Sequence, residues 1–257
     1  MKLDKSGGDT YSRTVKICGI SEDKVLAMIG DILADSGDTE VSVTSLVGEV
    51  HIKVSAASED KKSARKLIKP VISRLKELFG SYIYTTDEEI TLEKSVVDLL
   101  LANNLTVSCA ESCTGGMVSA RLINVPGVSE VYKSGYITYS NKSKRKILGV
   151  RRSTIDKYGV ISAETAMDMA KGLAGITKAD ICLSVTGNAG PDAAEGKPVG
   201  LVFIGCCIKG KVKVTEARFI GERNEIREAA TAAALSFLRH NMLEYYSRVT
   251  FGNEDED

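Results

Sequence analysis

The feature that most constrains the fold is an abrupt change of pattern at residues 105–116. An apolar run at 105–109 is followed by Ala-Glu-Ser-Cys-Thr-Gly-Gly at 110–116, and then by apolar residues at helical spacing. This pattern predicts a buried strand that ends in a tight turn and leads into a helix. Ser112 would lie at that junction, where unpaired backbone N–H groups can bind an anion. The position suits a nucleophile, and it equally suits a helix cap followed by two glycines that allow close packing.

The surrounding residues, from about 91 to 247, mix strand and helix patterns. Helices are predicted near 92–100, 117–123, 162–173 and 226–238, and strands near 105–109, 136–139, 181–185, 201–208 and 212–219. Strands and helices mixed in this order predict a layered α/β/α sandwich with a mixed sheet.

A smaller α/β unit is predicted before it, over residues 13–88. Strand patterns at 14–17, 41–43, 50–54 and 82–84 enclose helix patterns at 21–33 and 64–78. The order β-α-β-β-α-β is that of a small split α/β domain. We expect Pro70 to kink or split the second helix. Residues 1–12 are predicted to be loose, and 248–257 to form an acidic tail in solvent.

Composition restricts the class of partner. The chain has 34 basic and 34 acidic residues and a net charge of +0, which argues against bulk electrostatic binding of nucleic acid. No apolar signal segment is seen at the N-terminus, and the longest apolar run, 199–208, is shorter than the roughly 20 residues that span a bilayer. We therefore expect a cytoplasmic protein with no membrane partner.

Histidine and cysteine usage narrows the chemistry. The two histidines, His51 and His240, neighbour no candidate site, so neither a Ser-His-Asp triad nor a histidine-based metal site is expected. The six cysteines contain no C-x-x-C pair and are predicted to be mostly buried thiols. Cys113 is different, because a nearby helix N-terminus can lower a thiol pKa. It is a second candidate nucleophile.

A serine without a histidine needs another base. Residues 139–144, Tyr-Ser-Asn-Lys-Ser-Lys, directly follow a predicted strand. Lys144 could act as the base if burial lowers its pKa, and Tyr139 could orient either group. A polar turn that leads into a helix explains the same residues without any catalytic role.

Two further segments could hold a substrate. A strand ends in Thr-Gly-Asn-Ala-Gly-Pro at 186–191, which suits a cradle for a phosphate or carbonyl group, although a plain connecting loop fits equally well. Arg223 opens the last predicted helix and could form a fork onto a phosphate. An arginine at a helix start can also be an ordinary surface residue.

These segments together resemble a known family. A-E-S-C-T-G-G, Y-S-N-x-x-K, G-x-A-G-P followed by K-P-V-G, and G-x-R occur in the order found in the C-terminal domain of the CinA family, the nicotinamide-nucleotide amidase PncC. The resemblance covers roughly residues 91–245. Residues 13–90 are similar to the KH-like domain of full-length CinA proteins, but they lack a G-x-x-G loop, so RNA binding is not expected. The family's N-terminal molybdopterin-biosynthesis-like domain has no counterpart in this sequence, so its ADP-ribose pyrophosphatase activity is not carried over.

The resemblance implies hydrolysis of nicotinamide mononucleotide to nicotinic acid mononucleotide and ammonia, in pyridine nucleotide salvage. It implies no metal and no organic cofactor, and a homodimer or larger assembly. Ser112 would attack the carboxamide carbon, and Lys144 would accept the serine proton and pass a proton to ammonia. The other implied site residues bind the oxyanion or the substrate, or support the site: Cys113, Thr114, Gly115, Tyr139, Thr186, Gly187, Gly190 and Arg223.

Two departures from the family pattern keep other functions open. Ala193-Ala194 stands where the family usually has two glycines, and Asn188 stands where it often has isoleucine. The first alternative is a non-catalytic nucleotide-sensing or scaffold module derived from the enzyme. The second is an amidase that acts on another small amide.

Overall fold

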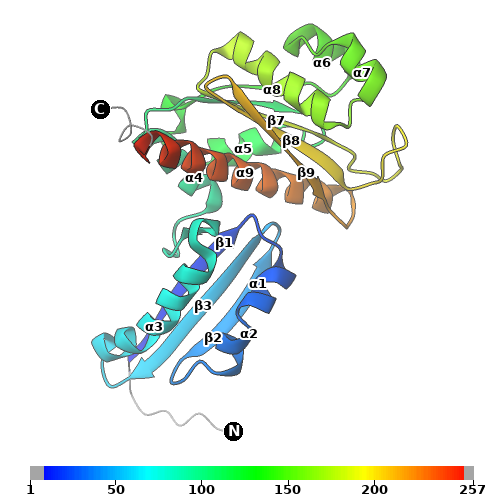
Figure 1. Cartoon of the computed structure of the whole chain (residues 1–257). Coiled ribbons are helices and arrows are strands. Elements are labelled where there is room, and N and C mark those ends of the chain that lie inside the picture. The colour runs from blue at the N-terminus through cyan, green and yellow to red at the C-terminus, as the bar shows by residue number, and fades with distance from the viewer. Residues whose placement is uncertain (1–8, 252–257) are drawn as a thin grey trace. The chain divides into compact units, whose positions relative to one another are not determined.

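The structure is a computed structural model that describes residues 9–251, and their side chains as far as residue 245. The chain divides into two compact units, Met1–Thr91 and Leu92–Asp257, which we describe separately (Figure 1). Residues 1–8 of the predicted loose segment, and residues 252–257 of the predicted tail, lie outside the described residues. The described ends differ from the prediction. Residues 9–12 belong to the first strand, whose pairing with a later strand already begins at Asp9, opposite Ser58. Residues 248–251 continue the last helix.

The first unit confirms the β-α-β-β-α-β order. Its elements are β1 (Asp9–Cys18), α1 (Glu22–Met28), α2 (Gly30–Ala34), β2 (Glu40–Leu46), β3 (Glu49–Ser58), α3 (Lys61–Phe79), the 3-10 turn η1 (Gly80–Tyr82) and β4 (Ile83–Thr85). The sheet has the order β2-β3-β1-β4, and all of its pairs are antiparallel. The single helix predicted at 21–33 is two helices, which meet at Ile29. The three helices share one apolar core with the sheet.

Helix α3 shows why the predicted split at Pro70 is wrong. The Asp60 carboxylate caps its start by accepting from the N–H groups of Lys62 and Ser63, at 2.8 and 3.0 Å. The helix then continues through Pro70 for 19 residues. A proline inside a helix removes one N–H donor. Here a continuous buried face compensates, formed by Ala64, Ile68, Ile72, Leu75 and Phe79.

The second unit is built around a mixed five-stranded sheet, as predicted. Its elements are α4 (Leu92–Ala102), β5 (Val107–Glu111), α5 (Met117–Ile123), η2 (Val128–Glu130), β6 (Tyr132–Ile137), α6 (Asn141–Leu148), α7 (Arg152–Tyr158), α8 (Ala163–Thr177), β7 (Ile181–Gly187), β8 (Leu201–Ile208), β9 (Lys211–Arg218) and α9 (Arg223–Phe251). The strand order is β6-β5-β7-β8-β9. Strands β6, β5 and β7 are parallel, and β8 and β9 are antiparallel to their neighbours.

Helices cover both faces of this sheet and make the predicted α/β/α sandwich. Helices α4, α5 and α9 lie on one face, and α6, α7 and α8 lie on the other (Figure 1). The strand predicted at 136–139 lies earlier, at 132–137, because its position is set by parallel pairing with β5. The carboxyl ends of β5, β6 and β7 lie at one edge of the sheet. The candidate site is at this edge, a common place for sites in α/β folds.

All six cysteines are among the described residues, and they are buried with reduced thiols, as predicted. No helix in the described part of the chain is long and apolar enough to cross a membrane.

Candidate active site

Ser112 follows β5 in a tight turn that is held by backbone hydrogen bonds. Its N–H donates to the Val185 carbonyl of neighbouring β7 at 3.0 Å, and its own carbonyl accepts from the Gly115 N–H at 3.1 Å. Gly116 has a φ of +100°, in the left-handed region that favours glycine. An added Cβ at Gly116 would also lie 3.2 Å from Ile137 Cδ1. The turn therefore holds the serine in place from both sides.

Lys144 lies on α6 and reaches into the core toward this serine. Helix α6 begins with a capping box, in which the Ser140 hydroxyl accepts from the Ser143 N–H at 3.1 Å. The Lys144 side chain is buried, with 1% of its surface exposed. Its Nζ lies 2.8 Å from Ser112 Oγ and 2.8 Å from the Thr138 carbonyl oxygen. The structure thus brings together the two residues that the sequence suggested as nucleophile and base.

Burial disfavours the charged form of the Lys144 side chain. Desolvation lowers the pKa of Lys144 from 10.5 to about 8, and the negative charge of Glu195 offsets part of that effect. An amine with this pKa is substantially neutral at slightly alkaline pH. In the neutral form its lone pair can accept the Ser112 hydroxyl proton, while one of its N–H groups still donates to Thr138.

The prediction of an activated Cys113 thiol is wrong. Burial raises the pKa of Cys113 to about 11, and the nearby backbone N–H groups and Lys144 lower it by less than burial raises it. Helix α5 begins only at Met117, and the turn is covered by Arg227, whose Nε donates to the Cys113 carbonyl at 3.0 Å. Cys113 is therefore a protonated thiol at neutral pH, which is a poor nucleophile.

The start of α5 is not an open anion site, because a buried carboxylate already occupies it. Glu111, with 1% of its surface exposed, is the last residue of β5. Its carboxylate accepts four hydrogen bonds of 2.6 to 3.2 Å, from the N–H groups of Gly116, Val118 and Ser119 and from the Ser119 hydroxyl. The expectation of unpaired N–H groups at the helix start is corrected accordingly.

Two backbone donors are left beside Ser112. The Gly115 N–H donates to the Ser112 carbonyl, so this N–H group is already used within the turn. No backbone carbonyl of residues 9–251 accepts from the N–H groups of Cys113 or Thr114. Both N–H groups belong to the turn that carries Ser112, and we expect them to be the donors for a developing oxyanion.

Arg223 links two loops at the edge of the site. Its Nη2 donates to the Tyr139 hydroxyl at 3.0 Å, and its Nη1 donates to the Gly190 carbonyl. Tyr139 is 62% exposed, and its hydroxyl is bonded to Arg223 rather than to Ser112 or Lys144. The orienting role expected for Tyr139 is thus not what its hydrogen bond provides. The two residues lie together at the exposed rim.

Thr186 and Gly187 support the end of β7 rather than contacting the serine. The Thr186 hydroxyl is buried and donates to the Val160 carbonyl at 2.7 Å. An added Cβ at Gly187 would lie 2.7 Å from the Leu201 carbonyl oxygen, so the close approach of β8 requires glycine there. Both residues therefore fix the strand that anchors the Ser112 N–H.

The loop after β7 is held by Asn188, one of the departures from the family pattern. Its Oδ1 accepts from the Gly190 N–H at 2.9 Å, and its Nδ2 donates to the carbonyls of Asp192 and Lys197 at 3.0 and 3.3 Å. One side-chain amide thus ties both ends of the loop together. This places the Gly190 carbonyl where it accepts from Arg223.

Two buried threonine hydroxyls have no hydrogen-bond partner among the described residues. Thr114 Oγ1 and Thr138 Oγ1 have no hydrogen bond in the described structure, and both residues are fully buried. Such groups are rare in native proteins, and each is normally satisfied by protein, water or ligand. Both threonines adjoin the candidate site. Thr114 follows Ser112 by two residues, and the Thr138 carbonyl accepts a hydrogen bond from Lys144. Within the described residues, no three His, Cys, Asp or Glu side chains gather as a metal site.

Comparison with known families agrees with the resemblance. Residues 89–242 match the CinA C-terminal domain, and residues 12–85 match the KH domain of damage-inducible protein CinA. The chain belongs to the CinA family. A putative competence-damage inducible protein from Clostridium novyi is 42% identical over 234 residues, which are 91% of this chain and 56% of that protein. A CinA-like protein from Dictyoglomus thermophilum is 42% identical over 94% of this chain and 59% of its own length. The chain thus spans less than two thirds of the length of these relatives.

Crystal structures of CinA proteins match part of the chain. A CinA superfamily protein from Klebsiella pneumoniae has a TM-score of 0.59 and 29% identity, covering 60% of this chain and 96% of that one. The competence/damage inducible protein CihA from Agrobacterium tumefaciens has a TM-score of 0.56 and 38% identity, covering 57% of this chain and 91% of that one.

Sequence reasoning missed three residues of this CinA site. The role of Glu111 could have been predicted from the sequence. An acidic residue at the end of an apolar strand, just before a helix begins, is well placed to cap that helix. Thr138 and Arg227 gave none. Their parts depend on the tertiary approach of α6 and α9 to the Ser112 turn.

Proposed function

We propose that this chain hydrolyses nicotinamide mononucleotide to nicotinic acid mononucleotide and ammonia, with Ser112 as nucleophile and Lys144 as base. The observation that carries the proposal is the 2.8 Å contact between Lys144 Nζ and Ser112 Oγ inside the protein. That distance is within the range expected between a nucleophile and its base. The carboxamide substrate comes from the CinA/PncC resemblance rather than from the geometry.

The first half of the reaction forms an ester on the serine. Neutral Lys144 takes the Ser112 proton as Oγ attacks the carboxamide carbon, and the N–H groups of Cys113 and Thr114 stabilise the oxyanion. Each such donor is worth about 3 kcal/mol in the transition state. The Thr138 carbonyl holds the resulting ammonium in place. Lys144 then gives its proton to the amide nitrogen, the C–N bond breaks, and ammonia leaves.

The second half releases the product. Lys144, neutral again, takes a proton from a water molecule that attacks the ester carbonyl. The proton returns to Ser112 Oγ as the ester bond breaks, and nicotinic acid mononucleotide leaves. One lysine therefore serves as base and acid in turn, so no second titrating group is needed.

The rim residues are the proposed phosphate site. A guanidinium has five N–H donors, and Arg223 uses two of them on Tyr139 and Gly190. Its remaining donors could bind a phosphate, with the loop that Asn188 holds as the adjoining wall. In this arrangement Tyr139 and Gly190 position Arg223.

A coupled ammonia assay with the mononucleotide tests the proposal. Ser112→Ala removes the proposed nucleophile and Lys144→Ala removes its proposed base. Each should lower kcat by at least about 10³-fold, because the two groups act together. Ser108→Ala is the matched control for a buried serine. Lys16→Ala is the control for a buried lysine, since Lys16 Nζ donates to the carbonyls of Glu88 and Ile90 in the first unit. Both controls should keep normal turnover.

The same assay separates the alternatives. Near-normal turnover of Ser112→Ala would end the serine mechanism. Thermal stabilisation of the wild type by the mononucleotide without ammonia release would favour a nucleotide-sensing module. Ammonia release from a different small amide only would keep the Ser-Lys chemistry and change the substrate.

A further inference from the structure

The segment around α6 and α7 is strongly basic in a chain that is neutral as a whole. Seven of the 18 residues 141–158 are lysine or arginine, and one, Asp156, is acidic. One of the seven, Lys144, faces the core and Ser112. The others are exposed. The net charge of the whole chain is +0, so this concentration is a local feature and not a result of overall composition.

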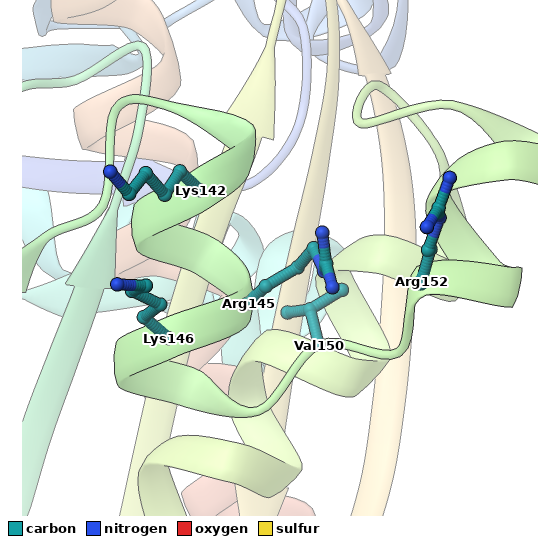
Figure 2. A pocket seen from close by; sticks show the side chains of 5 residues that line it. All are labelled: Lys142, Arg145, Lys146, Val150 and Arg152. Carbon is teal, nitrogen blue, oxygen red and sulfur yellow. The ribbon is translucent and has the colours of Figure 1, made fainter.

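Four of these cations surround one pocket on the outside of α6. The pocket has a volume of about 270 Å³ and is lined by Lys142, Arg145, Lys146, Val150 and Arg152. Figure 2 shows Lys142 and Lys146 projecting from the same side of α6, one turn apart, and Arg145 extending over Val150. Residues three and four apart share one face of a helix. Lys144 and Leu148 are the buried residues of α6, so the pocket lies on a different face from the Ser112 contact.

Helix stability alone does not account for this cluster. Arg145 and Lys146 are in the last turn, where cations are favourable, but Lys142 is in the first turn, where a cation opposes the helix dipole. Lys142 also has like-charged neighbours at i+3 and i+4, which destabilise a helix. Of the four cations, only Arg152 has an acidic partner among the described residues, Asp156 at 3.3 Å. The three on α6 thus repel one another, and no carboxylate of the described residues forms an ion pair with them.

We propose that this pocket binds a compact oligophosphate anion, either free or as the phosphate chain of a nucleotide. Several negative charges in a small volume would neutralise Lys142, Arg145 and Lys146 together, and the two arginines can form forked bonds to phosphate oxygens. Nucleic acid is the weaker fit, because it requires a basic stripe that extends along the surface. The inference does not depend on the amidase reaction.

Calorimetric titration of the full chain with inorganic triphosphate, at fixed pH and 0.1 M salt, tests the proposal. The variant Lys142→Gln/Arg145→Gln/Lys146→Gln should bind at least tenfold more weakly than the wild type. Lys24→Gln/Lys66→Gln/Lys69→Gln removes the same charge from exposed positions of the first unit and should bind like the wild type. The first variant should unfold at the same temperature or a higher one, because it removes repulsion within α6. A lost signal would therefore not reflect lost structure.

Two further ligands identify the source of the anion. Tighter binding of a nucleoside triphosphate than of inorganic triphosphate would support the proposal and assign a nucleotide ligand. Equal weakening in the two triple variants would overturn it, since the effect would then be net charge alone. Binding of a 20-base-pair duplex without binding of either triphosphate would also overturn it, as would no binding of any of the three.

Discussion

Lys144 is the residue on which the proposed chemistry depends most. It is useful as a base because it is buried as an amine whose charged form is poorly solvated, and its pKa falls to about 8. The base must be neutral when substrate binds. We therefore predict that kcat/KM for ammonia release rises about tenfold per pH unit below pH 8 and levels off above it. A profile measured from pH 6 to 9.5 checks this, and a flat or falling curve over that range would contradict it.

Glu111 is the other buried charge of the site, and we assign it a structural role. Glu111→Gln would remove the negative charge and turn an amide NH₂ toward donors at the start of α5. We predict a loss of about 2 to 3 kcal/mol in the free energy of unfolding, measured by urea denaturation. Glu228→Gln, an exposed change in the same unit, should cost less than about 0.5 kcal/mol. Equal stability of the two variants would argue against the cap.

Individual residues were predictable from the sequence where chemistry left few options. The shortage of histidines directed attention to Lys144 as partner for Ser112, and the structure places the two in contact. The pKa of Cys113 could not be predicted in the same way. It depends on how completely the turn is buried, and Arg227, 114 residues further on, is part of what covers it.

At the scale of elements, the position of Lys144 depends on how α6 packs against α8. Gly172 of α8 lies directly against the end of α6, and an added Cβ there would sit 1.7 Å from the Leu148 carbonyl oxygen. A methyl group at position 172 would therefore clash with the backbone of α6, and one of the two helices would have to move. The α6–α8 contact therefore requires glycine at position 172.

A pair of glycines in α8 provides a matched test. We predict that Gly172→Ala destabilises the protein by several kcal/mol, about 3 or more, and lowers ammonia release by moving Lys144 away from Ser112. Gly175→Ala meets nothing within 4 Å and should stabilise the helix by about 0.5 to 1 kcal/mol with unchanged turnover. Urea denaturation measures the stability of both variants, and the ammonia assay measures their turnover. The packing account fails if the two substitutions behave alike.

Most elements were predictable in type and order, and the errors come from tertiary contacts that the local sequence does not show. Alternating and helical patterns gave the β-α-β-β-α-β order and most of the five strands of the larger sheet. The strand β6 was displaced because pairing with β5, and not its own composition, fixes where it begins. The split at Pro70 was expected from proline alone, whereas tertiary burial of one face keeps α3 continuous.

For the whole molecule, the proposed site belongs to the second unit alone. Every residue in the mechanism lies in Leu92–Asp257, and the first unit has an apolar core of its own. We predict that a fragment of residues 89–257 folds and releases ammonia within about threefold of the full chain. Its far-ultraviolet circular dichroism confirms folding, and its Ser112→Ala form is the blank. A folded fragment without activity would show that the first unit is needed for turnover.

The resemblance to the CinA family also implies a homodimer or larger assembly. Light scattering of the full chain would measure its oligomeric state.

The measurement that tests the central claim most directly is trapping of the covalent intermediate. Acid quenching of the wild type in the first turnovers with nicotinamide mononucleotide, followed by mass spectrometry of the intact protein and its peptides, would show any ester. The account predicts an adduct equal to the mononucleotide minus ammonia, on the peptide that contains Ser112, absent in Ser112→Ala and retained in Cys113→Ser. An adduct that survives in Ser112→Ala but is lost in Cys113→Ser, or rapid ammonia release by Ser112→Ala, would contradict it.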